Sequence, residues 1–200
     1  MSHYYISRKK KGGKKLISDF IRGVTVEFET APGLFSESEI DKGTKLLIEV
    51  AEVPEEGIIL DMGCGYGAIG ITLAKAYPRL KVYMVDINRV AVELAKLNAK
   101  RNGVEDRVVV LHGDLYEPIK DKKFDVILSN PPLAAGMKVT ETIVTEAPHH
   151  LYKGGSLQVV LRKGHQAIAN LMKNTFGNVE ILASKWGYKV LKSTMNKLKI

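Results

Sequence analysis

The sequence of 200 residues has no long hydrophobic run and only one cysteine, Cys64. A membrane-spanning helix needs about 20 consecutive apolar residues, and no segment approaches that length. The N-terminal residues MSHYYISRKKKGGKK also lack the apolar core of a secretory signal. One cysteine excludes an internal disulfide and a cysteine-based metal cluster. We therefore expect a cytoplasmic protein with no membrane contact and no bound metal.

Acidic residues are scarce at both ends of the chain. Residues 1–22 hold seven Lys or Arg and one acid, and residues 185–200 hold five Lys and no acid. These two ends therefore carry +6 and +5. Because the net charge of the whole chain is +8, the residues between them carry −3. Cations near phosphates gain free energy by releasing condensed counterions, so this distribution favours a nucleic-acid partner. The alternative is that the basic ends only aid solubility or form a disordered arm.

Apolar runs of strand length alternate with helical patterns from Gly57 onward, without an internal repeat. Runs rich in Val, Ile and Leu are typical of strands that are buried on both faces of a parallel sheet. The expected strands cover residues 57–61, 81–87, 107–112, 124–130, 156–162, 179–183 and 188–194. The expected helices cover residues 40–51, 68–76, 89–101, 139–151 and 164–174. No helix separates the last two strands, so we expect an antiparallel end to the sheet.

This alternation predicts an α/β fold with a doubly wound, mostly parallel seven-stranded sheet and an antiparallel last strand. A chain of this length fits one domain with a full core, or one domain and a short appendage. We expect residues 1–35 to be a basic N-terminal stretch with short strands packed on the edge of the core. Residues 36–200 then form the main domain.

A glycine-rich loop follows the first strand of this alternation. It runs from Asp61 through Gly63 and Gly65 to Gly67, and a helix follows it. Glycines let the backbone turn tightly and approach a ligand without a Cβ atom in the way. From Gly65 the loop also matches the dinucleotide fingerprint G-x-G-x-x-G, with Asp86 21 residues later. An NAD(P)-linked oxidoreductase is therefore an alternative, although the carboxylate of Asp61 would repel a diphosphate.

The D-x-G-x-G-x-G pattern resembles the cofactor loop of class I S-adenosylmethionine (SAM)-dependent methyltransferases. The order of strands from Gly57 to the C-terminus is similar as well. The resemblance implies a Rossmann-like methyltransferase fold with SAM as its cofactor. In that family the loop wraps the methionine and ribose groups, and the leading acid lies near the methionyl amino group. The resemblance thus assigns Asp61, Gly63, Gly65 and Gly67 to the cofactor.

The same resemblance implies further cofactor contacts at the ends of the next two strands. Asp86, followed by Ile87, offers two acceptor oxygens to two ribose hydroxyls. Its alternative role is to cap the helix that begins near Asn88. Asp114, followed by Leu115, matches the family position that meets the adenine amino group. Its alternative role is to form a turn in H-G-D-L.

Asn130-Pro131-Pro132-Leu133 ends the fourth expected strand, at the edge where open α/β sheets hold ligands. An amino group conjugated to a base or an amide is a poor nucleophile. The side-chain oxygen of Asn130 and the carbonyl of Pro131 can accept its N–H bonds and aim its lone pair at the sulfonium methyl group. Prolines keep this loop stiff. We therefore expect Asn130, Pro131 and Pro132 to be catalytic, with Asn130 also beside the cofactor. The alternative is a strand followed by a Pro-Pro turn.

The N-P-P sequence resembles the signature of methyltransferases that act on adenine N6, guanine N2 or a glutamine amide. Several of those families place an aromatic residue next, where this chain has Leu133. Upstream, Gly33-Leu-Phe35-Ser36 resembles the methyltransferase small domain group. That group includes small-subunit ribosomal RNA guanine-N2 methyltransferases and single-domain archaeal relatives. Phe35 either stacks on a base in place of the missing aromatic or is a buried aromatic.

The sequence therefore predicts methyl transfer from SAM to an exocyclic amino nitrogen, with guanine N2 in ribosomal RNA as the leading target. Ribosomal RNA or a ribosomal subunit would be the partner, and Phe35 and Leu133 would contact the substrate. One group of alternatives keeps the chemistry and changes the target, to adenine N6 in RNA or DNA or to a protein glutamine amide. The others are an NAD(P)-linked oxidoreductase and a non-catalytic RNA-binding module.

Overall fold

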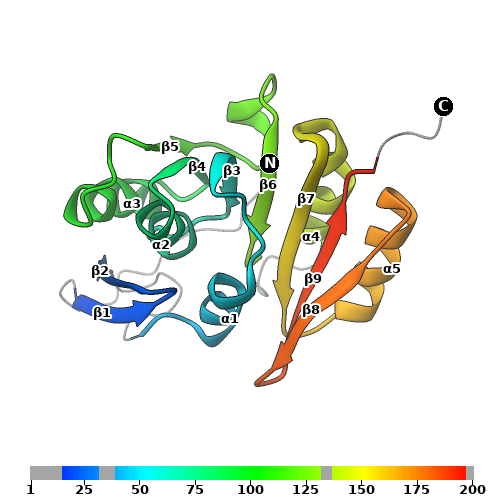
Figure 1. Cartoon of the computed structure of the whole chain (residues 1–200), viewed down its shortest axis with the longest axis horizontal. Helices are drawn as coiled ribbons and strands as arrows, with labels where there is room; N and C mark the ends of the chain where they lie inside the picture. The colour runs from blue at the N-terminus through cyan, green and yellow to red at the C-terminus, as the bar shows by residue number, and fades with distance from the viewer. Residues whose placement is uncertain (1–14, 32–38, 132–136, 197–200) are drawn as a thin grey trace.

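The computed structural model describes residues 15–31, 39–131 and 137–196. Its main element is a seven-stranded sheet with the strand order β5-β4-β3-β6-β7-β9-β8 (Figure 1). The strands are β3 (Glu56–Met62), β4 (Arg79–Asp86), β5 (Val108–His112), β6 (Phe124–Ser129), β7 (Leu151–Leu161), β8 (Glu180–Lys185) and β9 (Tyr188–Thr194). Strands β3 to β7 are parallel, and β9 is antiparallel to both of its neighbours. The predicted fold class is confirmed.

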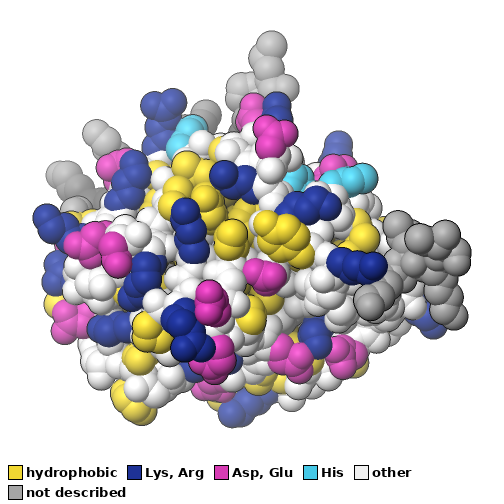
Figure 2. All heavy atoms as spheres, turned by 45° about the horizontal axis from the view of Figure 1, so that its top comes forward, with side chains coloured by type: hydrophobic (Ala, Val, Ile, Leu, Met, Phe, Trp, Pro, Cys, Tyr) yellow, Lys and Arg dark blue, Asp and Glu magenta, His cyan; other side chains and the backbone are white. Residues whose placement is uncertain are grey.

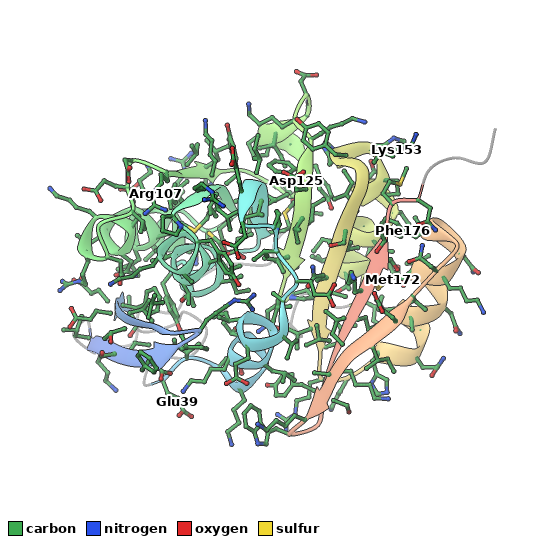
Figure 3. The ribbon with its side chains drawn as sticks, in the orientation of Figure 1. Glu39, Arg107, Asp125, Lys153, Met172 and Phe176 are labelled. Atoms are coloured by element: carbon green, nitrogen blue, oxygen red, sulfur yellow. The ribbon has the colours of Figure 1, made fainter. Side chains whose placement is uncertain are left out.

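Helices cover both faces of this sheet. They are α1 (Lys42–Val50), α2 (Ala68–Ala76), α3 (Arg89–Arg101), α4 (Met137–Glu146) and α5 (His165–Phe176). Helices α1 to α3 contribute to the hydrophobic core on one face, and α4 and α5 to the core on the other. Met172 and Phe176, two buried side chains of α5 in the second core, are labelled in Figure 3. The sheet is therefore doubly wound, as its buried Val-, Ile- and Leu-rich strands predict.

The N-terminal strands β1 (Lys15–Ile21) and β2 (Val24–Thr30) form a separate antiparallel hairpin. The hairpin packs on helices and does not extend the large sheet. Asn98 of α3 and Asn102, which caps the C-terminus of this helix, each exchange two hydrogen bonds with the backbone of β2. Phe28 of β2 is buried and its ring lies 5.5 Å from the ring of Tyr66 in the glycine loop. The short strands expected here therefore help to support the loop.

The predicted end of the helix 139–151 and the predicted start of the strand 156–162 are both wrong. Helix α4 ends at Glu146, a 3₁₀ turn covers Ala147–His150, and β7 begins at Leu151 instead of Ser156. Pro148 removes a backbone N–H and ends the α-helix. The following Lys153-Gly154-Gly155 segment belongs to β7, and the N–H of Gly154 donates to the carbonyl of Met195.

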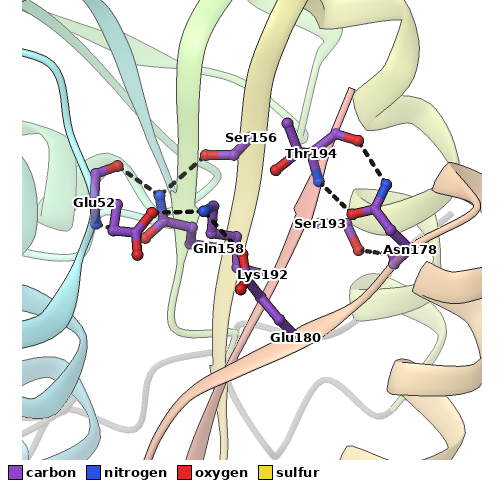
Figure 4. Close-up of polar contacts among 8 residues, drawn as sticks. All are labelled: Glu52, Ser156, Gln158, Asn178, Glu180, Lys192, Ser193 and Thr194. Atoms are coloured by element: carbon purple, nitrogen blue, oxygen red, sulfur yellow. Dashed lines mark hydrogen bonds and ion pairs between the residues drawn. The ribbon is translucent and has the colours of Figure 1, made fainter. Parts of the chain in front are cut away.

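Polar side chains connect strands β7, β8 and β9 to one another and to Glu52 (Figure 4). The buried amide of Gln158 accepts from the backbone N–H of Glu52 at 3.0 Å and donates to its carbonyl at 2.7 Å. Lys192 forms ion pairs with Glu52 and with Glu180. One of the basic residues near the C-terminus is thus neutralised within the fold. Within the described residues, no helix is long and apolar enough to cross a membrane.

Candidate active site

Strands β3 and β6 bring the glycine loop and the N-P-P segment together. They are adjacent and parallel, and Met62 pairs with Ser129 at their carboxyl ends. The hydroxyl of Ser129 donates to the carbonyl of Met62 at 2.8 Å. Gly63 and Asn130 therefore leave the sheet side by side. The chain order reverses between these two strands, which is where open α/β sheets form ligand crevices.

The glycine loop has the backbone shape that its sequence predicts. Gly63 and Gly65 have φ angles of +71° and +57°, in the region that favours glycine. A Cβ atom added at either position would meet nothing within 4 Å, so the loop borders open space. The N–H groups of Gly63 and Cys64 donate to the carbonyl of Val85 at 2.9 and 3.0 Å. The loop is thus tied to β4, and Gly67 (φ +97°) is the N-cap residue of α2.

Asp61 is completely buried beneath this loop. Its Oδ2 accepts a hydrogen bond from the N–H of Gly70 at 2.9 Å. Its Oδ1 is buried and has no hydrogen-bond partner among the described residues. Burial raises the pKa of Asp61 to about 7. A buried acceptor without a donor is costly, so a cationic amino group would stabilise this carboxylate.

The position of Asp61 also argues against a dinucleotide as the ligand. Dinucleotide folds bind a pyrophosphate with the free N–H groups at the start of the helix after the loop. Here one of those groups, on Gly70, already donates to a carboxylate. The negative charge of that carboxylate would repel a diphosphate at the same helix end.

Asp86 holds the loop from the end of β4. Its Oδ2 accepts from the N–H of Gly65 at 2.8 Å, and its Oδ1 accepts from the N–H of Asn88 at 2.8 Å. Helix α3 is capped by Asn88 itself, whose side chain accepts from the N–H of Val90. Each oxygen of Asp86 keeps capacity for a second donor, such as a ribose hydroxyl. Burial raises the pKa of this carboxyl group, and the hydrogen bonds from Asn88 and Gly65 act in the opposite direction.

The remaining predicted cofactor residues lie at the same edge. Ile87 directly follows Asp86 and is 44% exposed, which is high for a large apolar side chain. Asp114 is exposed, and its carbonyl accepts from the N–H of Glu117 in a tight turn. Leu115 has a φ of +48° in that turn. Asp114 therefore forms the turn that was its alternative role, and its exposed carboxylate lies on that turn.

The side chain of Asn130 is held in one orientation. Its Nδ2 donates to Oδ2 of Asp41 at 3.0 Å and to the hydroxyl of Thr44 at 2.8 Å. A carboxylate can only accept, so the amide nitrogen must face Asp41. The amide oxygen of Asn130 thus remains as the acceptor. Pro131 is buried next to it, whereas the predicted residues Pro132, Leu133 and Phe35 lie outside the described residues.

This site also includes Asp41, Thr44 and Tyr188, which no sequence motif predicted. Oδ2 of Asp41 caps α1 by accepting from the N–H of Thr44, and its Oδ1 accepts from the hydroxyl of Tyr188 at 3.0 Å. A Cβ atom at Gly43 would lie 2.5 Å from Cε1 of Tyr188, so glycine is needed for this approach. A glycine in the first turn of a helix is unfavourable by propensity, and that signal was available in the sequence.

The described part of the chain contains no group of three or more His, Cys, Asp or Glu residues that could hold a metal ion.

Comparisons with known proteins agree with this geometry. The family model "Methyltransferase small domain" matches residues 25–192. The chain is 37% identical to an uncharacterized protein, YbxB, of Bacillus subtilis over 199 residues, which cover 96% of this chain and 98% of YbxB. It is 40% identical to the ribosomal RNA small subunit methyltransferase C of Aeromonas hydrophila over 164 residues, or 80% of this chain and 46% of that protein. It therefore spans about half the length of that relative.

Solved structures give the same result. The structure of the T. thermophilus 16S rRNA N2 G1207 methyltransferase (RsmC), in complex with AdoMet and guanosine, matches with a TM-score of 0.82 and 27% identity. The match covers 92% of this chain and 51% of that protein. A methyltransferase from Pyrococcus furiosus, at 20% identity and a TM-score of 0.72, shares the fold.

These matches confirm the predicted cofactor and class of enzyme. They favour methyl transfer over the NAD(P)-linked alternative, in agreement with the buried carboxylate of Asp61. The chain belongs to the methyltransferase small domain family of SAM-dependent enzymes.

Proposed function

We propose that this protein transfers a methyl group from SAM to the N2 amino group of a guanine in ribosomal RNA. The orientation of Asn130 carries this proposal, because its amide oxygen faces away from Asp41 and Thr44 and is left as an acceptor. An exocyclic amino group is the donor that suits such an acceptor. Support for guanine comes from the relatives named ribosomal RNA small subunit methyltransferase C and from the neighbour that contains guanosine.

When bound, SAM supplies a methyl group made electrophilic by its sulfonium. The amide oxygen of Asn130 and the carbonyl of Pro131 accept the two N–H bonds of the guanine amino group. They draw the nitrogen out of conjugation and aim its lone pair. The N–C bond would form as the S–CH3 bond breaks, which leaves S-adenosylhomocysteine, and the methylated nitrogen would then lose one proton to water. A general base is not required before attack, because the nitrogen becomes acidic only after methylation. Positioning therefore provides most of the rate enhancement.

The described residues fit the cofactor. The unpartnered oxygen of Asp61 would take the methionyl amino group, and the open space over Gly63 and Gly65 would take the methionine and ribose. The second lone pairs of Asp86 would accept from the two ribose hydroxyls. Ile87, Asp114 and Leu115 would then contact the adenine from the next two strand ends.

Adenine N6 and a glutamine amide would present similar N–H groups to Asn130, so the test must identify the product. We would incubate the protein with methyl-labelled SAM and either deproteinised ribosomal RNA or intact small subunits. The RNA would be digested to nucleosides and separated by chromatography. Label in N2-methylguanosine is expected. Label in N6-methyladenosine, or label that resists RNase and is lost with protease, would contradict the proposed target.

The affinity for SAM should depend on pH through Asp61. The ionised carboxylate is the form that pairs with an amino cation, but burial keeps the pKa of Asp61 in the free protein at about 7. Below that pH, binding must first release a proton. We expect the dissociation constant to fall by up to about tenfold per pH unit between pH 5.5 and 7, and then to level off. Calorimetry between pH 5.5 and 7 measures the effect. This range lies below the pKa of an α-amino group, about 7.7–8.0, so the amino group of SAM stays protonated throughout.

Asp61→Asn is the matched control for this experiment, since it keeps the shape and an acceptor for Gly70 but cannot titrate. It should bind SAM more weakly and with a flat pH profile. The stability of the free protein should change with pH in the direction opposite to that of the SAM affinity. A folded-state pKa above the unfolded value of 3.8 means that stability declines as pH rises toward about 7. A SAM affinity that does not change with pH in the parent protein would exclude Asp61 from contact with the amino group.

Asp41 should act as a positioning residue for Asn130. Serine at position 41 can still cap α1, but it removes the carboxylate that accepts from Asn130 and Tyr188. We expect Asp41→Ser to lower kcat by about tenfold while the melting temperature and the SAM affinity stay close to those of the parent. Thr44→Ser, which retains the hydroxyl that Asn130 contacts, is the control. An equal loss in both variants, or a loss confined to KM, would contradict the assignment.

A further inference from the structure

We propose that the tip of the β8–β9 hairpin binds single-stranded RNA next to the methylation site, with Trp186 stacking on a base that flanks the target. This inference rests on the proposed RNA substrate and adds the surface that recognises it.

The sheet places the tip of the hairpin at the same edge as Asn130. Strand β9 is antiparallel to β7 and β8, so β8 runs parallel to β6 and β7 and ends at their carboxyl edge. The hairpin extends past the end of β7 in Figure 1. Its tip lies two to three strand positions from β6, which corresponds to about 10–14 Å at the usual strand spacing. Tyr188, just after the tip, contacts Asp41, which in turn contacts Asn130.

Trp186 is an unusual residue for this turn. Lys185 pairs with Tyr188, which leaves Trp186 and Gly187 as a two-residue turn with φ angles of +54° and +79°. Such turns favour Asn or Gly at the first position, because positive φ is strained for a bulky side chain. Trp186 is also 47% exposed, so it does not serve the core. A tryptophan at this position is therefore explained neither by the geometry of the turn nor by packing in the core. A role in stacking on a nucleotide base does explain it.

One cationic side chain lies over this aromatic, and others lie near the neighbouring Tyr188. The ammonium of Lys185 lies 4.2 Å from the centre of the Trp186 ring. The guanidinium of Arg162, just after β7, lies 5.8 Å from the centre of the Tyr188 ring, and Lys163 next to it is exposed. An exposed aromatic among cations is the combination with which proteins hold unpaired nucleotides, through stacking and phosphate contacts.

The acids of this part of the chain do not offset these charges. Residues 151–200 contain nine Lys or Arg and a single acid, Glu180. Glu180 is already paired with Lys192, toward the other end of the hairpin. On the face turned forward in Figure 2, by contrast, Lys and Arg are interspersed with Asp and Glu. Over residues 151–200, which include the hairpin, the excess of cations therefore favours a polyanion over an apolar or basic protein surface.

The proposal can be tested by fluorescence, because Trp186 is the only tryptophan of the chain. The full-length protein would be titrated with a 12-nucleotide oligoadenylate, with tryptophan emission and the anisotropy of a label on the RNA followed together. Stacking should quench the emission in step with binding. An abasic oligomer of the same length and charge is the control, and it should bind more weakly with little quenching.

A matched pair of variants separates stacking from charge. Trp186→Asn removes the ring and places Asn-Gly, a favoured sequence, in the turn. We expect it to weaken oligoadenylate binding by at least about fivefold and to leave the SAM affinity unchanged. Phe20→Ala removes a more exposed aromatic, 71% exposed on β1 of the separate β1–β2 hairpin, and should change neither affinity.

The outcomes distinguish this inference from the proposed function. Binding without quenching, or equal affinity for Trp186→Asn and the parent, would overturn the role of the hairpin while leaving RNA methylation intact. An absence of binding to oligoadenylate in the parent, together with label from SAM found in protein, would overturn the RNA substrate itself.

Discussion

Replacing Asn130 with alanine should lower kcat by at least about 100-fold while the dissociation constant for SAM changes by less than about threefold. The amide oxygen of Asn130 is the group assigned to the acceptor nitrogen, and alanine leaves that nitrogen conjugated and without this hydrogen-bond acceptor. An interaction used mainly in the transition state appears in kcat. Single-turnover methyl transfer to ribosomal RNA measures the rate, and calorimetry measures the cofactor affinity.

Two further variants make this result specific. Asn130→Asp retains the size of the side chain, but its carboxylate cannot donate to Asp41 and Thr44 and would be repelled by Asp41. It should be about as inactive as Asn130→Ala. Asn170→Ala removes an exposed amide from α5 and should be fully active. Turnover within about threefold of the parent in Asn130→Ala would remove this residue from the mechanism.

Replacing Asp86 with alanine should weaken SAM binding by at least about 100-fold. The substitution removes the acceptors for two ribose hydroxyls, at about 1.5–3 kcal/mol for each hydrogen bond to a charged group. It also removes the two hydrogen bonds that hold Gly65 and Asn88. The effect should therefore exceed that of ribose recognition alone.

Calorimetry with SAM and with methionine separates these two contributions. Loss of ribose recognition weakens SAM and spares methionine, whereas loss of the loop weakens both. The melting temperature of the free variant reports the loop contribution independently. Glu93→Ala, which removes an exposed carboxylate from the outer face of α3, is the control for a change of charge. Parent-like affinity for SAM in Asp86→Ala would show that the ribose assignment is wrong.

The parallel sheet could be predicted from local sequence patterns, since the strands are continuous apolar runs separated by helical periodicity. Helices α2 and α3 were predicted with the bounds that the structure has, Ala68–Ala76 and Arg89–Arg101. The position of the glycine loop and of Asn130 at one edge also followed, because parallel strands place their carboxyl ends together. These features depend on residues close to each other in the chain, or on the general topology of α/β sheets.

The orientation of Asn130 and the pKa of Asp61 depend instead on contacts between distant parts of the chain. Asn130 is held by Asp41, 89 residues away, and Asp41 is held by Tyr188, 147 residues away. The pKa of Asp61 depends on its complete burial, which arises from the packing of α2 on β3 and not from its neighbours in sequence. The early start of β7 at Leu151 likewise depends on its pairing with Phe124. Local patterns specify which elements form, whereas contacts between distant segments set the direction of a hydrogen bond and the cost of a buried charge.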